Sequence, residues 1–150
     1  IMHIVLYKPD IPQNTAAIIR LGACLNLNIH IIEPCGFNLN DVRFKRVVMD
    51  YMKFSKIFRY DNYDFFLKKH KKSRIVLMTT KAKKLYHEFK FKKTDMLLFG
   101  RESAGVSESL HQTIKNKIKV PMNRKTRSLN VAMSVAIIAS EALRQNNLLK

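Results

Sequence analysis

Short apolar runs alternate along this chain with segments that show the apolar spacing of an amphipathic helix, and this alternation restricts the possible folds most. The apolar runs predict strands at 3–7, 29–32, 56–60, 75–78, 96–99 and 118–120. The segments after them predict helices at 13–25, 41–48, 62–70, 107–114 and 130–145. This order favours an α/β fold with a mostly parallel sheet that is flanked by helices on both faces.

Polar residues that can cap a helix precede several of these segments. Asn40 or Asp41 would open the second helix, and Asp61 or Asn62 would open the third. Ser107 would open the fourth helix. Residue type therefore marks where these helices begin, although two of the starts have two candidates.

The length and composition suit one globular domain. The chain has 150 residues, enough for a single domain over 1–150 with its own core. Hydrophobic residues make up 47% of it, so intrinsic disorder is not expected. No apolar run approaches the roughly 20 residues that span a membrane, and we see no secretory leader.

Basic residues greatly outnumber acidic ones. The 28 Lys and Arg residues against 11 Asp and Glu residues give a formal net charge of +17. An AT-rich genome can raise the number of lysines without any binding partner, but it does not remove acidic residues. The charge therefore favours a polyanionic partner, with nucleic acid ahead of a membrane surface.

The cysteines and histidines predict neither disulfides nor a metal site. Cys24 and Cys35 form no C-x-x-C pattern, and two such thiols are typical of reduced residues in a cytoplasmic protein. The five histidines are scattered along the chain without the spacing of metal ligands. We therefore expect no bound metal.

The last predicted helix is apolar on almost every side between residues 131 and 139. A helix of this kind must be buried all round. The C-terminal helix of a small domain normally lies at the surface, so we expect a second copy of the chain to cover part of it in a homodimer. The alternative is that the sheet and a neighbouring helix cover it completely.

Three predicted strand ends carry polar or glycine-rich segments, and in open α/β sheets ligands bind at the carboxyl ends of the strands. Asn14 and Arg20 follow the first strand, the segment 100–105 follows the strand at 96–99, and the segment 120–130 follows the last strand. The glycine loop is neither a dinucleotide fingerprint nor a P-loop. No nucleophile–base arrangement for hydrolysis stands out.

Read together, these segments resemble the SPOUT superfamily of RNA methyltransferases. The motifs that carry the resemblance are Pro12-x-Asn14-x5-Arg20, Leu98-Phe99-Gly100-x-Glu102-x-x-Gly105, and Val120-Pro121-Met122 with Ser128-Leu129-Asn130. Within that superfamily, segments 4–15, 31–37, 50–51, 79–81 and 141–145 look like the single-domain enzymes that methylate the wobble nucleotide of tRNA. The resemblance covers essentially the whole chain.

The resemblance implies a C-terminal trefoil knot, a homodimer, and S-adenosylmethionine as the cofactor. It places the cofactor site at Met78, Thr80, Gly100, Glu102, Val120, Met122, Ser128, Leu129 and Asn130. Backbone groups of Val120 and Met122 would read the adenine edge, while Gly100 would let the chain approach the ligand without a Cβ clash.

The resemblance also implies the reaction, a transfer of the methyl group to the ribose 2′-oxygen of the wobble cytidine or uridine. Arg20 would clamp a phosphate and stabilise the developing alkoxide, because a free guanidinium is too basic to act as a simple general base. Asn14 would hold Arg20 or the ribose, while Ser128 and Asn130 would shape the loop at the reacting centre.

The tRNA anticodon stem-loop would meet basic side chains near the ends of the strands. The candidates for this contact are Lys81, Lys83, Lys84, Arg124, Lys125 and Arg127.

Three positions depart from the family pattern: Ala16, Met133 and Ser140. They leave substrate preference and dimer geometry open. The alternatives are methylation of another tRNA or rRNA ribose, and an RNA-binding protein without catalysis.

Overall fold

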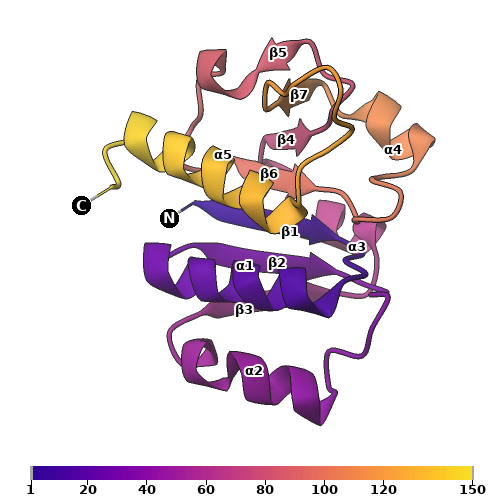
Figure 1. Ribbon diagram of the computed structural model, residues 1–150, viewed down its shortest axis with the longest axis vertical. Coiled ribbons are helices and arrows are strands. Elements are labelled where there is room, and N and C mark those ends of the chain that lie inside the picture. Colours follow the sequence, from indigo (N-terminus) through magenta and orange to yellow (C-terminus); the bar gives the residue numbers. More distant parts are fainter. Residues whose placement is uncertain (1, 150) are drawn as a thin grey trace.

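The computed structural model describes residues 2–149, which form one parallel sheet with helices on both faces (Figure 1). The seven strands lie in the order β3-β2-β1-β6-β4-β7-β5. They are β1 (His3–Tyr7), β2 (Asn28–Ile32), β3 (Lys56–Tyr60), β4 (Ile75–Met78), β5 (Lys84–Leu85), β6 (Met96–Phe99) and β7 (Asn116–Lys119). The helices are α1 (Pro12–Leu25), α2 (Val42–Met52), α3 (Tyr63–Lys69), the 3₁₀ turn η1 (Tyr86–Glu88), α4 (Glu108–Thr113) and α5 (Val131–Gln145). The predicted α/β architecture is confirmed.

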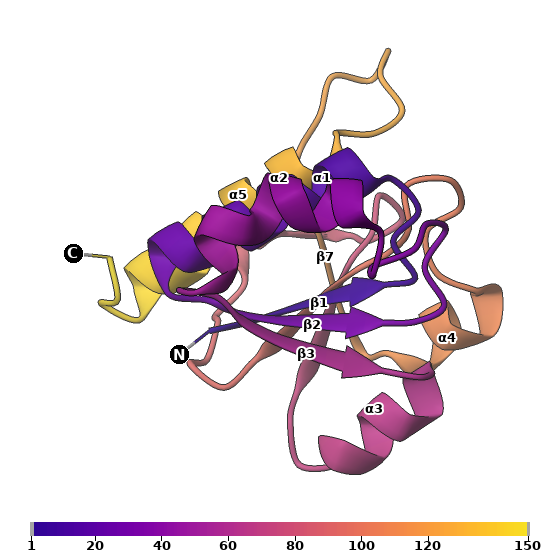
Figure 2. The same cartoon turned by 90° about the horizontal axis from the view of Figure 1, so that it is seen from below.

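The helices form two layers around the sheet. Figure 2 shows α1, α2 and α5 on one face, with α3 and α4 on the other. Successive residues of β1 therefore enter different cores: Ile4 packs with Ile18 of α1, while Val5 packs with Phe66 of α3. Because both faces are covered, the central strands are apolar on both sides, and this is why they read as continuous apolar runs.

Side-chain caps fix the starts of four helices. The carboxylate of Asp41 accepts from the Arg43 amide at 2.8 Å, and Asn62 accepts from the Phe65 amide at 2.8 Å. Ser107 caps α4. These contacts decide between the two candidates that the sequence allows at the second and third helices.

The largest departures from the predicted elements lie at the β5 edge of the sheet. The last strand covers Asn116–Lys119, whereas the sequence predicted 118–120. Val120 therefore belongs to the following loop. The strand β5 and the turn η1 were not predicted, because the segment around them is rich in lysine and has no apolar run. Within residues 2–149, β5 has two residues and pairs with β7 alone, so it leaves almost no periodic signal.

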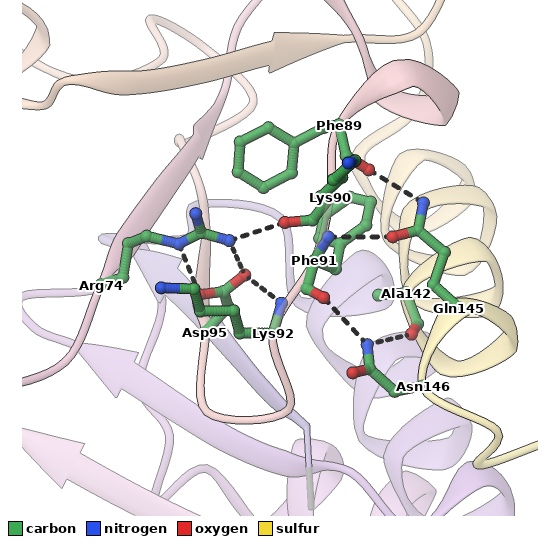
Figure 3. Close-up of polar contacts among 9 residues, drawn as sticks. All are labelled: Arg74, Phe89, Lys90, Phe91, Lys92, Asp95, Ala142, Gln145 and Asn146. Atoms are coloured by element: carbon green, nitrogen blue, oxygen red, sulfur yellow. Dashed lines mark hydrogen bonds and ion pairs between the residues drawn. The ribbon is translucent and has the colours of Figure 1, made fainter.

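A hydrogen-bonded strap ties the segment before β6 to the end of α5 (Figure 3). The Gln145 side chain donates to the Phe89 carbonyl and accepts from the Phe91 amide, both at 2.9 Å. In the same segment before β6, the fully buried Asp95 carboxylate accepts two hydrogen bonds from the Arg74 guanidinium, at 2.8 and 2.6 Å. This hydrogen-bonded pair raises the pKa of Arg74.

Between residues 2 and 149, no helix is both long and apolar enough to cross a membrane. The helix α5 packs beside α1 on one face of the sheet (Figure 1). The trefoil knot stays a prediction.

Candidate functional site

A cavity of about 500 Å³ lies at the carboxyl ends of the central strands. Its walls come from the loops after β1, β4 and β6, and from the segment that opens α5. The residues expected from the sequence that line it are Asn14, Met78, Thr80, Lys81, Gly100, Glu102, Ser128, Leu129 and Asn130. The structure therefore gathers residues from four distant parts of the chain around one space.

Hydrogen bonds centred on Glu102 join the loops of this cavity. One carboxylate oxygen accepts from the Asp10 amide at 3.1 Å, and the other accepts from the Asn14 side chain at 3.0 Å. The Asn130 side chain in turn donates to the Asn14 side-chain oxygen at 2.9 Å. Because each oxygen of Glu102 accepts a hydrogen bond from the segment after β1, this carboxylate holds the two loops together.

The carboxylate of Asp10 also binds the glycine loop, which covers residues 100–105. It accepts from the Glu102 amide at 3.2 Å and from the Ser103 hydroxyl. Burial raises the pKa of Asp10, but the hydrogen bonds from Ser103 and Glu102 outweigh burial and leave its pKa below the ordinary value. Asp10 is therefore a carboxylate at neutral pH and stays an acceptor.

The glycine loop folds back tightly on itself. The backbone amides and carbonyls of Arg101 and Gly105 pair at 3.2 and 2.8 Å. A Cβ on Gly100 would lie 2.6 Å from the Gly105 carbonyl carbon, and Gly105 itself has a φ of +63°. The missing side chain at Gly100 thus makes room for the chain's own backbone, whereas the sequence suggested room for a ligand.

Sequence reasoning missed several residues of the site. Thr79 and His111 share a hydrogen bond of 3.2 Å in the cavity wall, and Arg101 lines the cavity beside Glu102. Asp10 and Ser103 lie in loops that the motifs had marked, so their positions offered a signal. His111 lies in α4 and offered none.

Other expected site residues do not line the cavity. Arg20 is exposed on α1, and its guanidinium carbon lies 4.9 Å from the centroid of the Tyr51 ring. Val120 and Met122 are half-buried in the loop after β7. The expected RNA-contact residues that are exposed outside the lining are Lys83, Lys84, Arg124, Lys125 and Arg127.

The cavity combines apolar and polar walls. Leu77, Met78 and Leu129 offer apolar surface, while Asn14 and Glu102 form the polar side. Within residues 2–149, no group of His, Cys, Asp and Glu side chains is arranged to hold a metal ion. Walls of this kind suit a small organic ligand with both apolar and hydrogen-bonding parts.

The arrangement of the parallel sheet and its helices matches the methyltransferase fold of the SPOUT superfamily. Residues 1–140 match the model of the SpoU rRNA Methylase family, and this chain belongs to that family.

Relatives and solved structures match the chain over nearly its whole length. A protein of Ancylobacter novellus named tRNA (cytidine(34)-2'-O)-methyltransferase is 43% identical over 146 residues, which cover 96% of this chain and 92% of the relative. A solved structure concerned with the 2-OH methylation of C/U34 on tRNA is 35% identical, has a TM-score of 0.92, and covers 97% of this chain and 96% of its own. The SpoU methyltransferase AviRb from Streptomyces viridochromogenes, solved in complex with the cofactor AdoMet, is 21% identical with a TM-score of 0.83. That match covers 97% of this chain and 58% of AviRb, and it shows the shared fold alone.

Proposed function

We propose that this chain moves a methyl group from S-adenosylmethionine to the ribose 2′-oxygen of the wobble cytidine or uridine of tRNA. The observation that carries the proposal is the hydrogen-bonded series Asn130–Asn14–Glu102, which joins the three motif loops around one cavity. The Ancylobacter novellus relative is named for this activity at cytidine 34 and matches the chain almost from end to end.

The cavity fits the cofactor in size and in wall chemistry. Its volume of about 500 Å³ falls within the range of ~300–1,000 Å³ that small-molecule sites occupy. Met78 and Leu129 would pack on the apolar parts of the cofactor, and the residues expected to surround its polar parts are Thr80, Gly100, Glu102 and Ser128. When bound, the cofactor supplies the electrophilic methyl group.

The protein must orient the ribose and help its 2′-hydroxyl lose a proton. Arg20 would bind the adjacent phosphate and stabilise the negative charge that develops on the oxygen. A phosphate oxygen or water would take the proton, because the guanidinium of Arg20 has no acceptor site for it. Asn14, Ser128 and Asn130 would hold the reacting groups at the cavity mouth.

The position of Arg20 supports a homodimer. Arg20 lies six residues after Asn14 on α1, about 9 Å further along the helix axis, and outside the cavity lining. In a homodimer, Arg20 of one copy would serve the cavity of the other.

The surface of α5 supports the same assembly. Residues such as Val135, Ile138 and Ala139 are buried against the rest of the chain. Met133 on the opposite side is 63% exposed, and Ile137 one turn further is only half-buried. The sheet and α1 therefore do not cover this apolar helix completely, and a second copy would bury the remainder. Sedimentation at micromolar concentration should show a dimer, and a Met133→Glu variant should sediment as a monomer.

The basic residues near the cavity would position the anticodon stem-loop. Lys81 lines the cavity, and exposed lysines and arginines follow it on the loops after β4 and β7. Contacts of this type bind phosphates without reading sequence, so binding should weaken steeply with salt.

Two measurements test the proposed function. Calorimetry should detect S-adenosylhomocysteine binding to the folded protein, and the absence of binding would refute a cofactor-dependent enzyme. Incubation of tRNA with labelled cofactor should place the methyl group on the wobble ribose. A methyl group mapped to any other nucleotide would refute the assignment of the substrate position.

A further inference from the structure

Two cations lie against one buried tyrosine at the carboxyl edge of the sheet. The Lys8 ammonium is 5.4 Å from the centroid of the Tyr7 ring, and the Arg101 guanidinium carbon is 5.7 Å from it. Tyr7 ends β1, which pairs in parallel with β6 so that Leu6 lies opposite Phe99. Lys8 and Arg101 therefore follow neighbouring strands at equivalent positions, beside the proposed methyl-transfer site.

Neither cation is neutralised by the protein. Between residues 2 and 149, no carboxylate lies within ion-pairing distance of Lys8 or Arg101. The nearby carboxylates of Asp10 and Glu102 accept hydrogen bonds that join the loop after β1 to the loop after β6. Arg101 is only half-exposed, and its Nε is shielded from solvent without any hydrogen-bond acceptor. The protein therefore leaves part of the hydrogen-bonding capacity of this guanidinium unused.

The backbone of Lys8 gives a second, independent indication. Its φ is +47°, in the left-handed region that glycine and asparagine adopt more easily than lysine. Strained non-glycine residues of this type cluster at ligand-binding sites, where the side chain is needed despite the cost to the backbone. Lys8 is also half-buried, so its ammonium is held near the Tyr7 ring.

We propose that Lys8 and Arg101 form a binding site for one phosphate of the RNA substrate at the rim of the cavity. The guanidinium would grip two phosphate oxygens and the ammonium would add a point charge. This inference rests on the proposed function, because it assigns the anion to the RNA that the enzyme methylates.

The placement of the pair favours RNA over the carboxylate of the cofactor. Arg101 lines the cavity, whereas Lys8 lies outside its lining. An anion that reaches both must approach from outside the cavity, as the backbone of a docked stem-loop would. A phosphate at this rim would lie next to the nucleotide that enters the cavity.

The experiment compares Arg101→Gln and Lys8→Gly with the wild-type protein. The control is Lys56→Gln, because Lys56 is exposed at the amino end of β3, on the opposite edge of the sheet. Binding of a fluorescent anticodon stem-loop is measured by anisotropy at several salt concentrations. Binding of S-adenosylhomocysteine is measured by calorimetry, and melting temperatures check the fold.

Each of the two variants should weaken RNA binding about tenfold, the effect of one lost charge-assisted contact. Each should also reduce the slope of log affinity against log salt by about one. In Lys8→Gly, whose side chain lies outside the cavity lining, S-adenosylhomocysteine affinity should stay within twofold of wild type. Arg101→Lys should restore part of the binding, since the charge returns without the fork.

Lys8→Gly separates binding from folding, because glycine adopts the positive φ without strain. The variant should melt at or above the wild-type temperature and still bind RNA more weakly.

Wild-type RNA affinity and salt slope in folded variants would overturn the proposal. So would a loss of S-adenosylhomocysteine affinity with unchanged RNA binding, which would assign Arg101 to the cofactor. A wild-type protein that binds no tRNA would instead refute the proposed function, and this result appears before any variant is compared.

Discussion

Replacing Gly100 by alanine should damage both the fold and the cavity. The added methyl carbon would lie 2.6 Å from the Gly105 carbonyl carbon, 2.7 Å from its Cα and 2.9 Å from the Val106 amide nitrogen. All three neighbours are backbone atoms, so no side chain can rotate away to relieve the contact. The loop that lines the cavity must move instead.

The size of the effect follows from these distances. Nonbonded carbon atoms prefer separations of about 3.5–4.0 Å, so the loop must shift by about 1 Å at Gly105. Overpacking on this scale costs roughly 1–3 kcal/mol of stability. For a domain of this length, that corresponds to a fall in the melting temperature of about 2–12 °C. The same shift disturbs Glu102, which binds both Asp10 and Asn14, so ligand affinity should fall at least about tenfold.

Thermal unfolding and calorimetry with S-adenosylhomocysteine measure the two effects on one sample. The matched control is Gly22→Ala in α1, where the new methyl group would meet the Ile29 side chain at 2.9 Å. Ile29 is fully buried, so this control should also lose stability, but neither residue lines the cavity and the control should keep its ligand affinity. A Gly100→Ala protein with the wild-type melting temperature and wild-type ligand affinity would refute the claim that the glycine loop has no room for a side chain at position 100.

Three further predictions concern other parts of the molecule. Arg74→Met should lower the free energy of unfolding in urea by about 3–5 kcal/mol, because it leaves the buried Asp95 carboxylate without its partner. The double variant Arg74→Met with Asp95→Leu should recover part of this loss. A loss below about 1 kcal/mol in the single variant would contradict the prediction. Arg20→Ala should keep S-adenosylhomocysteine affinity within a few-fold of wild type and abolish methyl transfer, whereas unchanged turnover would remove Arg20 from the mechanism. Burial and the nearby His3 lower the pKa of His30 from 6.5 to about 3, so the unfolded chain binds a proton that the folded chain excludes. Stability should therefore fall as the pH drops below about 6.5, by about 2 kcal/mol at pH 5, and equal unfolding free energies at pH 7 and pH 5 would disprove it.

The alternation of strands and helices was enough to predict the location of the cavity. In a parallel sheet all carboxyl ends reach one edge, whatever the order of the strands. Asn14, Glu102 and Asn130 lie in segments that follow such strand ends, so we expected them near each other. Their direct hydrogen bonds follow from β1 lying beside β6, and no local pattern in the sequence encodes that pairing.

Features that depend on contacts between distant residues could not be predicted. The left-handed backbone of Lys8 and its approach to Tyr7 arise where the chain turns out of the sheet, and a lysine before a proline carries no signal for either. The pairing of Thr79 with His111 depends on how α4 packs over β4 and β6. Arg101 and Glu102 are adjacent in the sequence, yet no ion pair joins them within residues 2–149, and their order in the chain does not predict this.

The separation of Arg20 from the cavity links the two proposals about this protein. One chain would offer Lys8 and Arg101 to RNA beside its own cavity, while its Arg20 lies over the Tyr51 ring outside that cavity. In the proposed dimer, a stem-loop bound at one cavity would meet the rim cations of one copy and Arg20 of the other. The loss of Arg20 should then affect transfer far more than binding, and the loss of a rim cation should affect binding first. The two kinds of variant thus separate the groups that hold the RNA from the group that acts on the ribose.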